Sequence, residues 1–275
     1  MAARLTFRSF SVVTIFFFGV ITLRGAHFQN AAGENPWNGK RAAVILTYDD
    51  GLNVHLDNAI PLLDSLGLKA TFYVAAYPGA LDKRMNEWRQ AAAKGHELGN
   101  HTILHPCLGN IAGREWVQEE YDMSRYSVDR MVNEIRLANM LLKAIDGKTS
   151  RTFAFPCGDK AIGGVEYFEM VKKEFTGARG VTEGMHSNTD VDRFDVKCYA
   201  TNGQKGEELI DRVKTAIRQK KMLVFLLHGV GGEHSLDLSL EAHSELLRFL
   251  KQNEKDIWVS TMNEALEFLI KMNED

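Results

Sequence analysis

The sequence has few cysteines and little net charge. Only three cysteines occur in 275 residues, and Cys107, Cys157 and Cys198 form no C-x-x-C motif. This spacing argues against a cysteine-rich zinc or redox module and leaves at least one thiol unpaired. The formal net charge is −3, so the chain carries no excess of positive charge. That balance argues against nucleic acid as a partner.

Long apolar runs are also scarce, and the one near the N-terminus has a specific flank. Residues 10–23 contain no acidic residue and follow Arg4 and Arg8. This pattern is typical of a secretory signal, so residues 1–32 are interpreted as a signal peptide, with an N-terminal membrane anchor as the alternative. The run is shorter than the ~20 residues of a comfortable spanning helix. We therefore expect an exported protein, periplasmic, cell-surface or secreted, with no stable membrane span in the mature chain.

No internal repeats or low-complexity linkers interrupt residues 33–275, which are interpreted as one catalytic domain. Short apolar, β-rich runs alternate here with amphipathic helical stretches, which predicts a parallel sheet or barrel with its helices outside. The expected strands cover residues 42–48, 69–75, 97–101, 151–155, 176–181, 222–228 and 257–260. The expected helices cover residues 56–66, 85–94, 127–145, 206–219, 240–252 and 262–272.

Polar residues follow several of these strands directly. Asp49 and Asp50 come after the first strand, and His101 and His228 end later ones. Catalytic residues of parallel α/β barrels cluster at the carboxyl ends of the strands, so these segments are expected to converge on one rim. His101 and His105 can share one ion, and one aspartate of the Asp49–Asp50 pair completes a three-ligand metal site. The other aspartate is then free to act as a base.

Several segments resemble the motifs of one enzyme family, the NodB-type polysaccharide deacetylases of carbohydrate esterase family 4. Residues 47–51 (TYDDG) resemble its first motif, TFDDG, and residues 95–106 resemble its second almost residue for residue. Residues 226–228 fit its last motif, Leu-x-His, whereas residues 153–158 only partly resemble its third, RPPYG. No convincing fourth motif, an aspartate with a tryptophan, occurs between residues 190 and 199. The resemblance covers roughly residues 40–269.

The resemblance implies a distorted, incomplete (β/α) TIM-like barrel of the NodB type. It also implies a metal-dependent hydrolase that removes N- or O-acetyl groups from an acetylated polysaccharide or oligosaccharide. One divalent ion is expected on Asp50, His101 and His105, commonly Zn²⁺, with Co²⁺, Mn²⁺ or Ni²⁺ as alternatives. The residue types agree, because two neutral imidazoles and one carboxylate leave coordination positions open for water and substrate.

The same resemblance implies roles for the remaining site residues. Asp49 is expected to be the general base, and His228 the acid that protonates the departing group. The backbone N–H of Cys157 is expected to hold the oxyanion together with the ion. Pro156 and Trp116 are candidate substrate-binding residues, although packing explains Trp116 equally well.

The chain departs from the family at the third motif. The family arginine that orients the catalytic aspartate is replaced here by Ala154. Arg151 cannot substitute, because residues three apart on a strand face opposite sides. Arg193 or Lys160 could supply the charge from a neighbouring loop. The missing arginine and the absent fourth motif leave open a non-catalytic, metal-containing carbohydrate-binding protein. The resemblance also leaves open a non-sugar amide hydrolase on the same scaffold, an activity that some members of the family have.

The remaining cysteines and histidines allow two further predictions. Cys107 follows the second motif and Cys157 lies in the third, so a disulfide between them is expected, with two free buried thiols as the alternative. His234 and His243 are interpreted as surface residues without a role.

Overall fold

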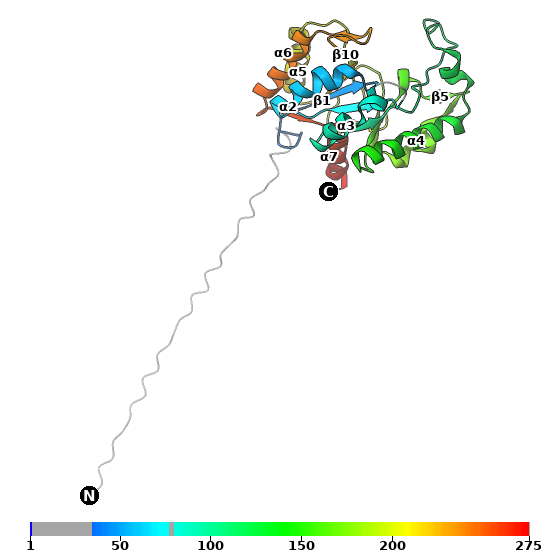
Figure 1. Cartoon of the computed structure of the whole chain (residues 1–275). Helices are drawn as coiled ribbons and strands as arrows, with labels where there is room; N and C mark the ends of the chain where they lie inside the picture. The colour runs from blue at the N-terminus through cyan, green and yellow to red at the C-terminus, as the bar shows by residue number, and fades with distance from the viewer. Residues whose placement is uncertain (2–34, 77–79, 275) are drawn as a thin grey trace.

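A curled sheet of parallel strands forms the centre of the structure. The computed structural model describes residue 1, residues 35–76 and residues 80–274 (Figure 1). Its strands follow the order β7-β4-β3-β2-β1-β9-β8. One edge of β1 pairs with two strands: its N-terminal half pairs with β12, and its C-terminal half pairs with β2. The strands are β1 (Ala42–Asp49), β2 (Thr71–Val74), β3 (Glu97–Asn100), β4 (Thr152–Ala154), β7 (Gly177–Arg179), β8 (Tyr199–Ala200), β9 (Met222–Leu227) and β12 (Ile257–Ser260).

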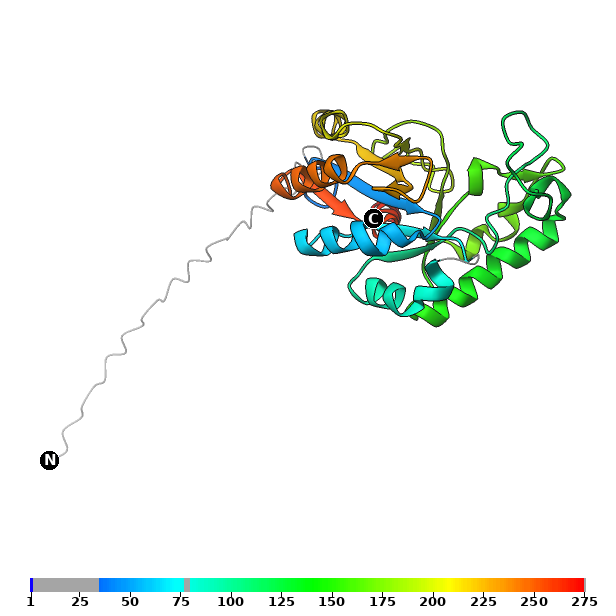
Figure 2. The ribbon, with the colours of Figure 1, turned by 45° about the horizontal axis from the view of Figure 1, so that its top comes forward.

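Helices cover this sheet. In Figures 1 and 2, α5 and α6 lie toward one end of the sheet and the long helix α4 lies toward the other. The α-helices are α2 (Ile60–Leu66), α3 (Ala80–Ala93), α4 (Val128–Asp146), α5 (Gly206–Gln219), α6 (Leu240–Gln252) and α7 (Met262–Glu274). Shorter helical segments are η1 (His55–Ala59), η2 (Glu119–Tyr121), η3 (Met123–Arg125), η4 (Pro156–Gly158), η5 (Tyr167–Met170) and η6 (Lys172–Glu174). Two small pairings, β5 (Ala161–Ile162) with β6 (Val165–Glu166) and β10 (Gly229–Val230) with β11 (Asp237–Leu238), lie outside the main sheet.

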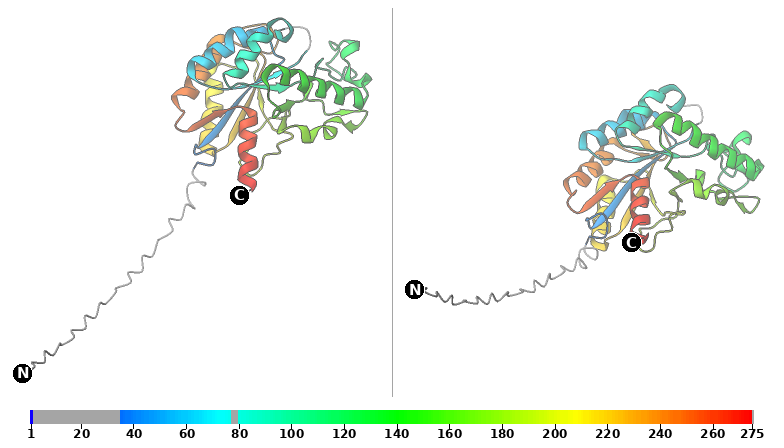
Figure 3. Two further views of the ribbon diagram at one scale, coloured as in Figure 1. Left: turned by 60° about the horizontal axis from the view of Figure 1, so that its bottom comes forward. Right: turned by 90° about the horizontal axis from the view of Figure 1, so that it is seen from below.

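Strand β1 is buried on both faces, and its alternating side chains enter two different cores. Val44 and Leu46 pack in the core that includes residues of α2, α5 and α6, whereas Ala43 and Ile45 pack against α7. Figure 3 shows α7 lying beside β1. Because side chains alternate along a strand, Asp49 points to the same face as Ala43 and Ile45. The last residue of β1 therefore faces the same side of the sheet as α7, which covers the N-terminal half of the strand.

Helix α4 links the fold to the loop that follows β3. Ser127 caps the helix by accepting a hydrogen bond from the backbone N–H of Arg130, and Gly147 ends it in the left-handed conformation. The side chain of Asn100 donates to the carbonyl of Ile135 at 2.8 Å. Its Oδ1 accepts from the backbone N–H of Thr102, also at 2.8 Å. The start of the 101–105 loop is thus attached to α4.

The expected fold class is confirmed. Each predicted strand and helix has a counterpart, and parallel strands carry helices on their outside. The barrel is incomplete, since β7 and β8 end the strand order of the described residues and an isolated bridge between Arg179 and Val196 connects β7 to the segment leading to β8. Among the described residues, no helix has the length and apolar character needed to cross a membrane. The segment interpreted as a signal peptide or anchor lies outside the described residues apart from residue 1.

Candidate active site

The residues predicted as metal ligands, base, acid and oxyanion donor meet at one cavity of about 520 Å³. Asp49 and Asp50 reach it from the end of β1, His101 and His105 from the loop after β3, and His228 from the end of β9. Strands that are parallel and adjacent bring their carboxyl ends to the same edge of a sheet, which explains the convergence.

The three predicted metal ligands have the spacing of a ligand set. Asp50 Oδ1 lies 3.4 Å from His105 Nε2 and 3.6 Å from His101 Nε2. Two ligands of a tetrahedral zinc ion, with bonds of ~2.0–2.2 Å, lie about 3.4 Å apart. Asp50 Oδ1 is also buried without a hydrogen-bond partner in the described part of the chain. A buried carboxylate oxygen facing two imidazoles fits a shared cation.

Local hydrogen bonds orient the two histidines. His101 Nδ1 lies 2.9 Å from the carbonyl of Ala154, so Nδ1 carries the proton and Nε2 keeps its lone pair for the site. Burial lowers the pKa of His101 to about 4, which favours the neutral, ligating form. The loop between the histidines is tightly bent, with φ of 67° at Thr102 and 49° at His105. The hydroxyl of Thr102 accepts from the His105 backbone N–H at 3.0 Å.

Asp50 is held in its charged form by the same neighbours. Burial alone raises the pKa of a carboxyl group, but the surrounding histidines outweigh it here. His105 and His101 contribute most, and the pKa of Asp50 falls to about 2. Asp50 has a φ of 77°, an uncommon conformation for a residue with a side chain, and Gly51 follows at 67°. The backbone thus turns sharply at the point where two adjacent aspartates take different directions.

Asp49 forms an ion pair that the sequence analysis missed. Its Oδ2 accepts from Nη2 of Arg179, whose side chain is fully buried at the end of β7. Although burial opposes the charge on Arg179, Asp49 holds the pKa of this guanidinium above its ordinary value. The other carboxylate oxygen, Oδ1, is buried and has no hydrogen-bond partner among the described residues. One oxygen of Asp49 is therefore fixed and the other is free.

The two residues suggested as sources of this charge do other things. Lys160 Nζ lies 2.6 Å from Asp195 Oδ2, and Arg193 donates to the carbonyl of Thr176 at 3.0 Å. Both interpretations were wrong, because a fully buried carboxylate needs a partner that is buried with it. The available signal was the position of Arg179 near the end of a predicted strand, 176–181.

The expected disulfide is present in the structure. Cys107 and Cys157 are bonded, with their Cα atoms 5.8 Å apart, and join the loop after β3 to the turn after β4. Cys157 has a φ of 56°. Its carbonyl accepts from Arg114 Nη2 at 3.1 Å, while its N–H donates to no protein group in the residues that the structure describes. The N–H is thus available at the cavity edge, where Cys157 is part of the lining.

His228 is held in place through its backbone carbonyl. Its carbonyl lies 2.8 Å from Nε2 of the buried His55, whose Nδ1 in turn accepts from the Leu52 N–H. Its Nδ1 is buried and, within the described ranges, has no hydrogen-bond partner. Burial lowers the pKa of His228.

Of the two histidines interpreted as surface residues, one is buried. His243 is buried, and its Nε2 lies 2.7 Å from the hydroxyl of Tyr48. This interpretation was wrong, because the packing of α6 on β1 is not visible in a local pattern. His234 keeps 29% of its side chain exposed and lines the cavity, with its ring stacked on that of His228 at 4.5 Å between centroids and 11° between planes.

Apolar side chains complete the cavity wall. Trp116 lies in the lining and remains 63% exposed, so its indole is available to a ligand rather than packed in a core. Phe155, Val181 and Leu236 line the cavity as well. Pro156, expected beside them, is buried and is not part of the lining.

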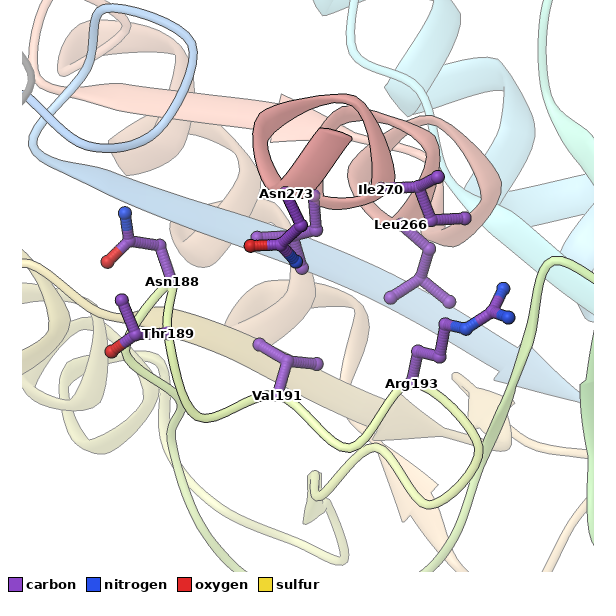
Figure 4. A pocket seen from close by; sticks show the side chains of 8 residues that line it. Asn188, Thr189, Val191, Arg193, Leu266, Ile270 and Asn273 are labelled. Carbon is purple, nitrogen blue, oxygen red and sulfur yellow. The ribbon is translucent and has the colours of Figure 1, made fainter. Parts of the chain in front are cut away.

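A second hollow lies elsewhere and lacks such chemistry. It measures about 70 Å³ and is bordered by α7 and the segment around residues 188–193, including Val191, Arg193 and Ile270 (Figure 4). Arg193 is its one titratable side chain, so the hollow offers no cluster of acid, base or ligand groups.

Comparisons with known proteins agree with the motifs. Residues 38–163 match the family described as Polysaccharide deacetylase. The chain is 31% identical over 107 residues to the peptidoglycan-N-acetylglucosamine deacetylase of Bacillus cereus, covering 38% of this chain and 35% of that protein. It is 35% identical over 85 residues to the chitooligosaccharide deacetylase of Sinorhizobium fredii, covering 30% and 38%. It is also 31% identical over 119 residues to a gellan lyase of Bacillus sp, covering 43% and 4%.

These matches cover well under half the length of the curated relatives.

A solved structure extends the likeness at the level of fold. A candidate polysaccharide deacetylase from Mycobacterium smegmatis aligns with a TM-score of 0.59 over 85% of this chain and 92% of that one, at 14% identity. The shared architecture therefore reaches beyond residues 38–163.

Proposed function

Because residues 38–163 match the polysaccharide deacetylase family, we propose that this chain removes acetyl groups from a polysaccharide or oligosaccharide with the help of one divalent metal ion. The observation that carries the proposal is the meeting of Asp49, Asp50 and His101 with His105 and His228 around one cavity. A carbohydrate-binding protein without activity has no need for both a free carboxylate and a free imidazole there.

Asp50, His101 and His105 hold the ion. The spacing of their ligand atoms, the orphaned Oδ1 of Asp50 and the fixed tautomer of His101 support this assignment. Held by these three residues, a zinc ion would supply a water molecule of lowered pKa and polarise an acyl oxygen. Zinc is the expected metal, and Co²⁺, Mn²⁺ or Ni²⁺ are alternatives with the same donor set.

Asp49 acts as the general base. Arg179 fixes Oδ2, so Oδ1 is the atom that accepts a proton from the attacking water. The ion pair prevents the carboxylate from rotating away from the cavity, and His101 Nε2 lies only 3.8 Å from Oδ2. The base is thus positioned beside the ligands without being one of them.

Two groups serve the later part of the reaction. The N–H of Cys157 donates to the oxygen on which negative charge develops, and the disulfide keeps this turn in place. His228 delivers a proton to the departing amine or alkoxide. Because burial favours its neutral form, the proton that His228 gives to the departing group is the one that Asp49 has taken from the attacking water.

The substrate is an acetylated sugar polymer or oligomer outside the cell. The names of the two deacetylase relatives support N-acetylglucosamine-containing chains, and the exposed face of Trp116 offers a stacking surface for a sugar ring. Export is supported by the apolar run at residues 10–23, and a disulfide beside the site suits an oxidising compartment.

Acetate release by the mature chain tests the proposal. The protein is chelated and assayed with and without added zinc on chitopentaose, peptidoglycan fragments and acetylated xylooligosaccharide. We expect zinc-dependent release from one of them and none from Asp49→Asn. Bound zinc without release from any acetylated sugar would overturn the proposal and favour a non-sugar amide substrate or a binding role.

A further inference from the structure

We propose that His234 is a specificity residue, which donates a hydrogen bond from Nε2–H to a sugar oxygen next to the acetyl group. The inference rests on the proposed function and adds a substrate contact to it. His234 lies outside the family-type motifs of the site, six residues beyond His228 on the 229–238 loop.

The first step is the position of the ring. His234 lines the same cavity as the predicted metal ligands and stacks on His228. Its Nε2 lies 3.8 Å from Asp50 Oδ2, too far for a hydrogen bond. In the described part of the chain Nε2 makes no hydrogen bond, and His234 lines the cavity that a substrate would fill.

The second step is the tautomer. His234 Nδ1 accepts a hydrogen bond from the backbone N–H of Leu236 at 3.0 Å. A neutral imidazole has one acceptor nitrogen and one donor nitrogen, so Nε2 carries the hydrogen. This is the opposite arrangement to His101, whose Nδ1 faces the carbonyl of Ala154 and whose Nε2 is the acceptor.

The tautomer decides between two roles for His234. Asp50, His228 and His234 lie close enough to form an alternative metal-binding group. A metal would bind His234 through the lone pair of Nε2. Because Nδ1 accepts the hydrogen bond from Leu236, Nε2 carries the hydrogen and has no lone pair to offer. The geometry therefore favours a donor to substrate over a fourth ligand.

The third step is the rigidity of the loop. Glu233 Oε2 accepts from the Val54 N–H at 2.8 Å, and Oε1 accepts from Asn53 at 2.6 Å. Gly232 N–H donates to Asp237 Oδ1 at 2.9 Å. These contacts attach the loop to the segment just after the two aspartates, so His234 is held in register with the metal ligands. Such preorganisation is what a specificity contact requires.

Two substitutions of His234 distinguish the role of Nε2 from that of Nδ1. In His234→Asn, the short amide can still accept from Leu236 but reaches no further. In His234→Gln, the longer amide places an N–H near the former Nε2. We expect His234→Asn to lower kcat/KM about tenfold on the acetylated sugar that the wild type cleaves fastest, the size of one hydrogen bond. His234→Gln should recover most of this loss.

The readouts include a small ester and the metal. With 4-nitrophenyl acetate, which has no sugar oxygens, His234→Asn should stay within about twofold of wild type, and zinc content by mass spectrometry should be unchanged. Equal losses on both substrates, or loss of zinc, would overturn the inference in favour of a role on His228, Asp50 or the metal. In the inactive Asp49→Asn background, calorimetric binding of the acetylated sugar that the wild type cleaves fastest should also weaken with His234→Asn, and unchanged binding contradicts the contact. A wild type that neither cleaves nor binds any acetylated sugar removes the proposed function and this inference together.

Discussion

Arg179 lies directly opposite Ala154 in the parallel ladder between β7 and β4. Residues paired in this way point to the same face of a sheet, so the guanidinium of Arg179 approaches the site from the strand beside the one where the resemblance expects an arginine. It reaches Asp49 in place of a residue at position 154. The small side chain of Ala154 leaves that space open. The missing arginine is therefore a relocation, which weakens the case for a protein without catalytic activity.

Replacing Arg179 tests the relocation. Arg179→Met leaves the buried carboxylate of Asp49 unpaired, which costs about 3–5 kcal/mol of unfolding free energy. We also expect kcat/KM to fall by roughly 10- to 100-fold or more, because an unfixed base loses its orientation. Urea unfolding and acetate release measure the two effects.

Arg193→Met and Lys160→Met are the matched controls, since both cations form ion pairs or hydrogen bonds away from Asp49. The double variant Arg179→Ala with Ala154→Arg returns a cation to the same face and should recover part of both losses. Controls that lose as much activity as Arg179→Met would show that the pair with Asp49 has no special role.

The sequence predicts the site residues that lie close together in short motifs. It does not predict a site residue whose position depends on how distant strands pair. Asp49, Asp50, His101 and His105 stand in short motifs, and the structure gathers them. Arg179 lies 130 residues from Asp49, and no spacing rule connects them. Only the register of β4 against β7, a consequence of how the whole sheet curls, brings this arginine to the aspartate.

The same limit explains the histidines. His234 and His243 look like isolated polar residues in the sequence. His243 is buried because α6 presents it to Tyr48, whose hydroxyl needs a partner in the core. His234 returns to the cavity because its loop is attached through Glu233 to Asn53 and Val54. Both facts need contacts between distant segments.

Metal binding and catalysis should separate cleanly by residue. His105→Ala removes one of three ligands, and we expect zinc content to fall below one ion per chain together with activity. Asp49→Asn should retain zinc and lose activity, since it removes the base and not a ligand. Metal analysis of both purified variants provides the check. Loss of zinc from Asp49→Asn would assign this carboxylate to the metal instead.

The Cys107–Cys157 disulfide should stabilise both the fold and the turn that carries the Cys157 N–H. It closes a loop with a sequence separation of 50, for which chain entropy gives a stabilisation of roughly 4 kcal/mol, with 2–4 being typical. We expect Cys107→Ser with Cys157→Ser to unfold at lower urea concentration and to lose part of kcat. Thiol titration of the unfolded, unreduced wild type should find one free thiol, Cys198; three free thiols would mean that the bridge does not form.

Acid should weaken the fold through buried neutral histidines. Burial lowers the pKa of His243 from 6.5 to about 4. The unfolded chain therefore binds the proton more readily, and the stability contributed by neutral His243 is present above pH 6.5 and lost as the pH falls toward 4. His96, also buried and with a pKa of about 4, acts in the same sense. We expect about 1–2 kcal/mol of loss per histidine at pH 5.

His243→Gln can keep a hydrogen bond to Tyr48 without titrating. Urea unfolding at pH 7 and pH 5 should therefore show a smaller difference for this variant than for wild type. An identical difference in both proteins would assign the acid sensitivity to other groups.

Trp116 should matter for long substrates and not for the chemistry. Its indole is 63% exposed at the cavity and also borders a neighbouring groove with Leu104, Val117 and Tyr121. An aromatic ring held open beside a site stabilises a stacked sugar by on the order of 1 kcal/mol. We expect Trp116→Ala to raise KM several-fold for chitopentaose and to leave kcat/KM for 4-nitrophenyl acetate unchanged, because the small ester does not reach the groove. Trp116→Phe keeps an aromatic face and is the matched control. Its KM for chitopentaose should lie between those of the wild type and Trp116→Ala. If Trp116→Ala lowered kcat/KM equally for chitopentaose and for 4-nitrophenyl acetate, with normal zinc content, the tryptophan would be supporting the 105–121 loop rather than contacting the sugar.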